Sequence, residues 1–119
     1  KPIYIKGKLG LWNYSITHEL RLHDEPFKLI KAGTKTIELR LYDEKRQEIN
    51  VGDEIEFTSR TTGEKQLTEV CAIHLFNTFA EIYRDFDKIS LGYDINEEAS
   101  FTDLEKYYNK FNTDTIFFM

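Results

Sequence analysis

The sequence predicts an α+β fold in which a small curled β-barrel or sheet of about five to six mostly antiparallel strands carries short helices at its rim. Three observations support this prediction. Short segments with period-two alternation recur along the chain, short amphipathic segments lie between them, and turn-forming residues separate the two kinds. A length of 119 residues with 40% hydrophobic residues suits one domain with a real core.

The first predicted elements are a strand and the helix that follows it. Leu20 and Leu22 alternate with a polar residue, as in a half-buried strand. Asp24 then offers a capping carboxylate, and Pro26 is tolerated in a first helical turn. Gly33 can adopt the left-handed conformation that ends a helix. A helix of two to three turns is therefore expected between Asp24 and Gly33.

The middle of the chain is predicted to consist of strands joined by turns. Residues 36–42 alternate in polarity, and the Val-Gly-Asp sequence at 51–53 is typical of a tight turn. A half-buried strand at 54–58 then leads into a hairpin turn at 61–64. The return strand should span about 66–76, which is long enough to bend or to carry a bulge.

The last third contains two predicted helices and a closing strand. Thr78 can cap the first helix, and either Asn96 or Ser100 can cap the second. Each segment carries apolar residues at helical spacing, most of which are expected in the core. The apolar, aromatic residues 115–118 are expected to form the closing strand.

The N-terminal residues 1–16 are predicted to form an accessory arm, and residues 17–119 the domain itself. Ile3 and Ile5 alternate in a way that permits an added strand. Basic residues in the same segment can also extend a binding surface.

Composition favours a soluble cytoplasmic protein. No run approaches the roughly 18 apolar residues of a membrane-spanning helix, and no leader resembles a signal peptide. The single Cys71 lies in an apolar run, which predicts a buried small hydrophobe and excludes an internal disulfide. The three histidines and one cysteine lack metal-site spacing, so neither a metal nor another cofactor is expected.

The net charge of −5 argues against a protein that coats nucleic acid through bulk electrostatics. The excess of acidic over basic side chains lies in residues 81–119, which hold 4 basic and 9 acidic side chains. Basic residues nearer the N-terminus can therefore form a local positive patch, although ordinary solubilising charge explains them equally well. The candidates for this patch are Lys28, Lys31, Lys35, Arg40, Lys45 and Arg46.

One short segment concentrates opposite charges beside the helix end. Glu38 and Arg40 share one face of the predicted strand, and Lys35 precedes them. Arg offers a planar fork of donors for phosphate or a base edge, Lys a mobile charge, and Glu an acceptor for an exocyclic amine. Together they can recognise a nucleotide. The alternative is an ion pair on a wet sheet face, without function.

The same segment resembles the ASCH domain family of the PUA-like superfamily. The family signature G-x-K-x-x-E-x-R is matched in residues 30–40, and a Gly-Asp turn follows at suitable spacing. The resemblance covers roughly residues 17–118. The residues that carry it are Gly33, Lys35, Glu38, Arg40, Gly52 and Asp53.

This resemblance implies a PUA-like β-barrel with a cleft where the signature residues meet. Similar proteins are generally proposed to bind RNA or a nucleoside-like ligand. One branch hydrolyses acetylated cytidine with a Lys, a Thr nucleophile and a carboxylate, and another relative is described as a ribonuclease. Lys35 corresponds to the Lys of that hydrolase branch, but Glu38 stands where the branch has its Thr. Lys35 and Glu38 are thus the catalytic candidates if the chain is an enzyme.

Four further residues are candidates for ligand or RNA contact, each with an ordinary structural alternative. Tyr42 can stack on a base or pack in the barrel, and Asp53 can bind a ligand or fix its own turn. Arg60 and Lys65 flank the hairpin loop, where they can touch an RNA backbone or simply be solvated.

The interpretation favoured by these observations is a binding module for RNA, or for a nucleoside or nucleotide, with Lys35, Glu38 and Arg40 lining the cleft. An amidohydrolase acting on acetylated cytidine, a metal-independent ribonuclease and a protein-interaction module are the alternatives. The sequence leaves the oligomeric state open.

Overall fold

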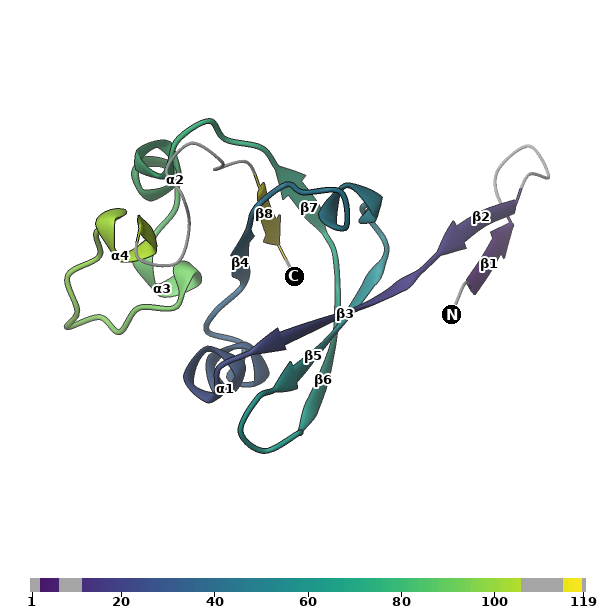
Figure 1. The fold of residues 1–119 in the computed structure, drawn as a ribbon, viewed down its shortest axis with the longest axis horizontal. Helices are drawn as coiled ribbons and strands as arrows, with labels where there is room; N and C mark the ends of the chain where they lie inside the picture. The colour runs from purple at the N-terminus through teal and green to yellow at the C-terminus, as the bar shows by residue number, and fades with distance from the viewer. Residues whose placement is uncertain (1–2, 7–11, 106–114, 119) are drawn as a thin grey trace.

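The computed structural model describes residues 3–6, 12–105 and 115–118, whose strands form three small sheets (Figure 1). β1 (Ile3–Lys6) and β2 (Trp12–Ser15) form an antiparallel hairpin that projects from the rest of the chain (Figure 1). The added strand that the alternation of Ile3 and Ile5 permits is therefore present. That residues 1–16 act as an accessory arm stays a prediction.

The second sheet has the order β3-β5-β6, with β3 at Thr17–Leu22, β5 at Glu54–Ser59 and β6 at Lys65–Glu69. β5 pairs in parallel with β3 and antiparallel with β6. Its residues alternate between buried and half-buried, so one face of this sheet builds the core. Ile55 and Phe57 are fully buried there.

The third sheet has the order β4-β8-β7, with β4 at Ile37–Arg40, β7 at Ala72–His74 and β8 at Thr115–Phe118. Both pairings are antiparallel. The β4 residues Ile37, Glu38 and Leu39 are all buried, so this short strand is covered on both faces.

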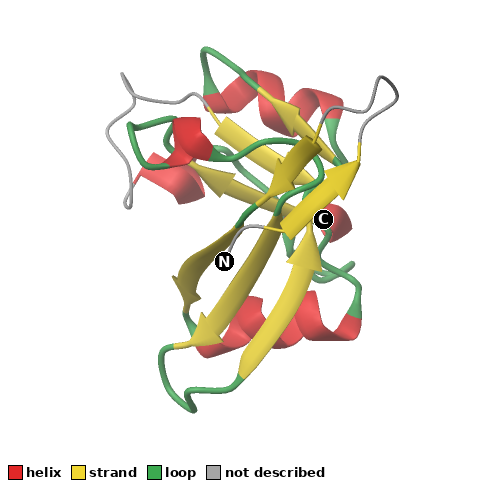
Figure 2. Ribbon diagram, turned by 90° about the vertical axis from the view of Figure 1, so that its right-hand side faces the viewer, coloured by secondary structure: helices red, strands yellow, loops and turns green. Residues whose placement is uncertain are grey.

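The helices are short and lie around the sheets (Figure 2). They are α1 (Asp24–Ala32), α2 (Phe79–Asp85), α3 (Lys88–Leu91) and α4 (Thr102–Glu105), with one 3-10 turn, η1, at Arg46–Glu48. Within the described ranges, no helix has the length and apolar character needed to cross a bilayer.

The core has two parts, one for each three-stranded sheet. One part joins α1 to the β3-β5-β6 sheet, and the other joins β4 to α2 and α3. The buried residues of the first are Leu20, Leu22, Phe27, Ile30, Ile49, Ile55, Phe57 and Val70. Those of the second are Ile37, Leu39, Phe79, Ile82 and Leu91.

Several predicted element ends are confirmed. Gly33 has a φ of 84° and closes α1 with backbone hydrogen bonds to Leu29 and Ile30. Thr78 caps α2 by accepting a hydrogen bond from the Glu81 amide. Ser100 accepts from the Thr102 amide at the start of α4, and the residues that would extend this helix beyond Glu105 lie outside the described part.

The α+β class is confirmed, but the pairings of the described strands leave two separate three-stranded sheets and do not close a barrel. The single return strand predicted for 66–76 is wrong. It divides into β6 and β7, which belong to different sheets, because Val70 between them exchanges backbone hydrogen bonds with Gly52 and Asp53. The two three-stranded sheets together contain six described strands, which agrees with the five to six expected, and the β1-β2 hairpin is separate from them.

Two residue-level predictions are also wrong. Cys71 is exposed, because it lies in the break between β6 and β7 where Val70 takes the buried position. Asp24 does not cap α1. Its carboxylate accepts a hydrogen bond from Ser59 Oγ at 2.9 Å and pairs with Lys28 at 3.0 Å, and these contacts, led by Lys28, lower the Asp24 pKa.

Candidate functional site

Lys35, Glu38 and Arg40 form a buried chain of alternating charge. Lys35 is only 7% exposed and lies between α3 and β4, where its Nζ donates to the carbonyls of Ile37 at 2.6 Å and Leu91 at 3.0 Å. The same Nζ lies 3.4 Å from Glu38 Oε1. The predicted proximity of the three groups is thus real, but Lys35 faces protein carbonyls.

Glu38 is the centre of this chain, because each of its oxygens contacts a different cation. Arg40 Nε donates to Glu38 Oε2 at 2.8 Å, opposite the contact with Lys35. Arg40 also donates through Nη2 to the Arg21 carbonyl at 2.9 Å, which ties β4 to the edge strand β3. A carboxylate between two cations is compensated despite its burial. Glu38 therefore holds Arg40 in one position.

The local backbone explains how Lys35 reaches its position. The left-handed Gly33 turns the chain from α1 toward β4, directly before Lys35. Gly92, with a φ of 107°, ends α3 on the other side. A Cβ at Gly92 would lie 3.1 Å from Lys35 Cδ, so the missing side chain leaves space for the lysine.

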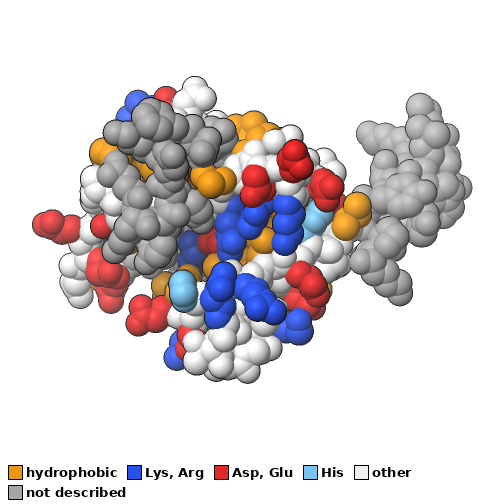
Figure 3. Space-filling view, viewed as in Figure 1, with side chains coloured by type: hydrophobic (Ala, Val, Ile, Leu, Met, Phe, Trp, Pro, Cys, Tyr) orange, Lys and Arg blue, Asp and Glu red, His pale blue; other side chains and the backbone are white. Residues whose placement is uncertain are grey.

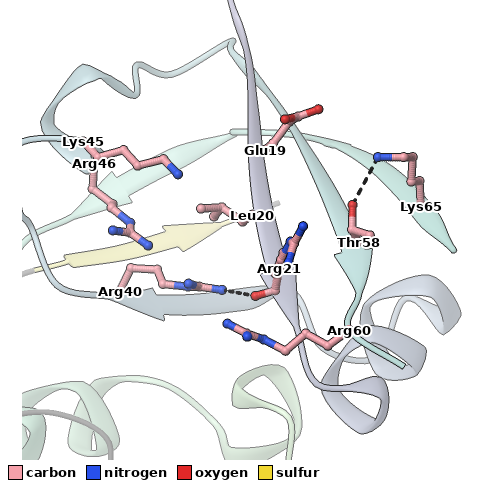
Figure 4. A pocket seen from close by; sticks show the side chains of 9 residues that line it. All are labelled: Glu19, Leu20, Arg21, Arg40, Lys45, Arg46, Thr58, Arg60 and Lys65. Atoms are coloured by element: carbon pink, nitrogen blue, oxygen red, sulfur yellow. Dashed lines mark hydrogen bonds between the residues drawn. The ribbon is translucent and has the colours of Figure 1, made fainter. Parts of the chain in front are cut away.

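A cavity of about 380 Å³ lies where the two three-stranded sheets meet, next to Arg40 (Figure 4). Figure 3 shows Lys and Arg side chains gathered at the centre of this face, with acidic side chains around them. Six of the nine lining residues are cationic. The lining consists of Glu19, Leu20, Arg21, Arg40, Lys45, Arg46, Thr58, Arg60 and Lys65.

The cations around this cavity, here called the basic cavity, fall into two groups. Three form ion pairs: Arg40 with Glu38, Arg46 with Asp43 at 2.7 Å, and Lys65 with Glu56 at 3.2 Å. The other three have no ion pair within the described part of the chain. These unpaired cations are Arg21, Lys45 and Arg60.

Arg46 adds an unsatisfied donor to the wall of the basic cavity. Its Nη1 donates to Asp43, but its buried Nε has no hydrogen-bond partner among the described residues. A buried donor without a partner costs roughly 1 to 3 kcal/mol. An anionic oxygen in the basic cavity is the kind of group that satisfies such a donor.

Only some of the residues predicted to bind a ligand line the basic cavity. Arg40, Arg60 and Lys65 line the basic cavity. Lys35 and Glu38 lie beneath Arg40 and do not belong to the lining. Tyr42 is half-buried outside the lining, and its carbonyl accepts a hydrogen bond from the Gln47 side chain.

Asp53 is buried away from the basic cavity and holds the start of β3 against the turn before β5. Its carboxylate accepts hydrogen bonds from the amides of Ile16 at 3.2 Å and Asn50 at 3.0 Å. It also lies 2.8 Å from His18 Nε2. Only 2% of the residue is exposed, and these three contacts satisfy the buried Asp53 carboxylate.

The predicted positive patch is rearranged in space. Arg40, Lys45 and Arg46 line the basic cavity, whereas Lys28 and Lys31 on α1 form ion pairs with Asp24 and Glu64.

Sequence reasoning did not single out Glu19, Arg21 or Thr58 as site residues. The sequence feature that could have identified them is the alternation of polar and apolar residues in β3 and β5. This alternation turns the three polar side chains away from their buried neighbours.

Fold and site together define a small α+β domain with a cation-lined cavity at the junction of two sheets. The chain belongs to the ASCH domain family, whose profile matches residues 20–116. This match confirms the resemblance to the family. The comparison with curated proteins gave no match.

Two solved structures are similar to this chain over most of its length. The crystal structure of the hypothetical protein PH0355 is 28% identical, covers 86% of this chain and 94% of its own, and has a TM-score of 0.68. The solution structure of protein PF0455 from Pyrococcus furiosus is 31% identical, with 86% and 93% coverage and a TM-score of 0.58.

Proposed function

We propose that this protein binds single-stranded RNA, with phosphate groups held in the basic cavity. The observation that carries the proposal is the convergence of three unpaired cations, Arg21, Lys45 and Arg60, on one cavity in an otherwise acidic chain. Lys and Arg that neutralise phosphates supply the main sequence-independent part of RNA affinity. Membership in the ASCH domain family, whose members are generally proposed to bind RNA, supports it.

Arg40 is the best-placed phosphate ligand. A guanidinium has five N–H donors, and Arg40 uses one at Nε and one at Nη2 for contacts inside the protein. The remaining three have no partner among the described residues. Because Glu38 and the Arg21 carbonyl fix its orientation, Arg40 loses little side-chain entropy when it binds an anion.

Lys35 and Glu38 are positioning residues in this proposal. Both are buried beneath Arg40, and their polar atoms contact protein groups. They set the position of Arg40 without touching the ligand. The proposal therefore gives them no catalytic role.

The test measures RNA affinity by fluorescence anisotropy for the variants Arg21→Gln, Arg60→Gln and Arg84→Gln. Arg84 is an exposed cation on α2 outside the basic cavity, so Arg84→Gln makes the same charge change elsewhere. We expect Arg21→Gln and Arg60→Gln each to weaken binding about three- to tenfold near physiological salt, and Arg84→Gln to leave it nearly unchanged. Equal weakening by all three variants would refute the proposed location.

A single nucleotide is the second candidate ligand, because a volume of about 380 Å³ lies in the range of small-molecule sites. Titration with a nucleoside monophosphate and with a nine-nucleotide RNA separates the candidates. An RNA strand as ligand predicts much tighter binding of the longer molecule, since more phosphates are neutralised. A nucleotide ligand predicts equal affinities.

A further inference from the structure

The basic cavity contains one residue whose chemistry does not suit phosphate. Glu19 is the sole acidic member of its lining, in β3 two positions before Arg21 (Figure 4). It is exposed, and the part of the chain that the structure describes gives its carboxylate no ion pair or hydrogen bond. An unpaired carboxylate beside several cations weakens phosphate binding. Glu19 therefore calls for a role other than phosphate binding.

The three paired cations of the lining contact carboxylates other than Glu19, and the three unpaired ones form no ion pair with it among the described residues. Lys65 pairs with Glu56, which lies opposite Glu19 in the register of β3 and β5. Arg40 pairs with Glu38. The Glu19 carboxylate is therefore available to a ligand in the basic cavity.

We propose that Glu19 gives the RNA site a preference for guanine. An ionised carboxylate has only acceptors, and the Watson–Crick edge of guanine presents two adjacent donors, the N1–H and the N2 amino group. Adenine and cytosine offer one amino donor beside an acceptor, and uracil offers one N–H between two carbonyls. Bases of single-stranded RNA are read on these edges.

The placement of Glu19 and Arg21 permits both to contact one nucleotide. Residues two apart on a strand project from the same face about 7 Å apart. Arg21 then contacts the phosphate while Glu19 reads the base. This inference rests on the proposed RNA binding and adds a base preference to it.

The test uses nine-nucleotide oligouridines that carry guanine, inosine, adenine, cytosine or uracil at the central position. We expect the guanine oligomer to bind at least about fivefold more tightly than the uracil oligomer, the lower limit for a good two-donor contact. Inosine lacks only the N2 amino group, so it should lose most of this preference.

The variant Glu19→Gln replaces one acceptor with a donor and should bind guanine and inosine oligomers equally. Its affinity for the uracil oligomer should be unchanged or higher, because one negative charge is gone. The control Glu69→Gln removes an exposed carboxylate outside the lining and should retain the guanine preference. Unchanged thermal midpoints show that both variants are folded.

The outcomes separate this inference from the function on which it rests. Binding of all five oligomers with equal affinity, or a guanine preference that survives Glu19→Gln, overturns the role of Glu19 and leaves the RNA site intact. Absence of binding to every oligomer overturns the proposed function and the base preference together.

Discussion

Glu38 is the residue on which the arrangement of the site depends most. Its carboxylate is buried between Lys35 and Arg40, with contacts of 3.4 Å and 2.8 Å. Removing one member of a buried charge network leaves the others uncompensated, which costs more than the network contributes as a whole. The charge of Glu38 should therefore matter more for stability than that of an exposed carboxylate.

The variant Glu38→Gln is expected to lower the free energy of unfolding by about 3 to 5 kcal/mol, because Lys35 loses its compensating charge inside the protein. Urea denaturation measures this change. Glu56→Gln, which removes the partner of the more exposed Lys65, should cost at most about 1 kcal/mol. Similar losses in the two variants would show that the buried charges of Lys35, Glu38 and Arg40 contribute no more to the free energy of unfolding than an exposed ion pair.

Individual residues were predictable from the sequence where local chemistry decides. Gly33 ends α1 as expected. A helix that ends on a residue in the left-handed conformation requires little beyond a residue without a Cβ at that position. Cys71 was predicted wrongly, because its exposure depends on the break between β6 and β7, which no local pattern reveals.

At the scale of elements, α3 is the part of the fold that connects helix packing to the site. Its last residue, Leu91, accepts a hydrogen bond from Lys35, and Gly92 leaves the space that the lysine occupies. Through Lys35 and Glu38, the end of this four-residue helix is joined to Arg40 in the basic cavity.

The variant Gly92→Ala should destabilise the protein by more than Gly63→Ala. Both glycines have positive φ, so an alanine at either is strained by roughly 1 to 3 kcal/mol. Only the Cβ at Gly92 would meet Lys35, because nothing lies within 4 Å of the one at Gly63. Thermal unfolding of both variants measures the difference. Equal shifts would mean that the lysine moves aside without cost.

The variant Thr78→Ala should destabilise α2 by about 1 kcal/mol, because the Glu81 amide loses its capping acceptor. Urea denaturation of this variant, with Thr61→Ala in the exposed hairpin turn as comparison, tests the value. A loss no larger than that of the turn variant would count against the cap.

The elements that the sequence predicted well are those defined by neighbouring residues, such as α1, α2 and the hairpin of β5 and β6. The parallel pairing of β3 with β5 is different. It joins residues about 37 positions apart, and the alternation of each strand does not specify its partner.

At the scale of the whole molecule, charge is separated along the chain. Residues 81–119 carry the negative excess, while the cations of the basic cavity come from β3, β4, β6, the turn after β5 and the segment around η1. An acidic protein with one basic cavity repels a polyanion from most of its surface. Under the proposed function, this charge distribution directs RNA to the face that carries the basic cavity.

The salt dependence of RNA binding should report how many phosphates the basic cavity holds. Each neutralised phosphate of a single strand contributes about 0.7 to the slope of log affinity against log salt. Removing one contact with Arg60→Gln should reduce the magnitude of the slope by about that amount. An unchanged slope would mean that Arg60 contacts no phosphate.

The site as a whole was only partly predictable from the sequence. Lys35, Glu38 and Arg40 were expected to lie close together, and they do. That the first two lie beneath the third, with Arg21 and Glu19 beside it, follows from the meeting of two sheets and not from any spacing in the chain. Strand pairing between distant segments decides which polar residues share a cavity.

The most direct test of RNA binding in the basic cavity is a titration of the labelled protein with a nine-nucleotide RNA, followed by backbone amide NMR shifts. The account predicts that the largest shifts fall on residues 19–21, 40, 45–46, 58–60 and 65. Residues 94–98 in the acidic part should change little. Shifts confined to that acidic part, or absent at RNA concentrations that saturate anisotropy, would contradict the account.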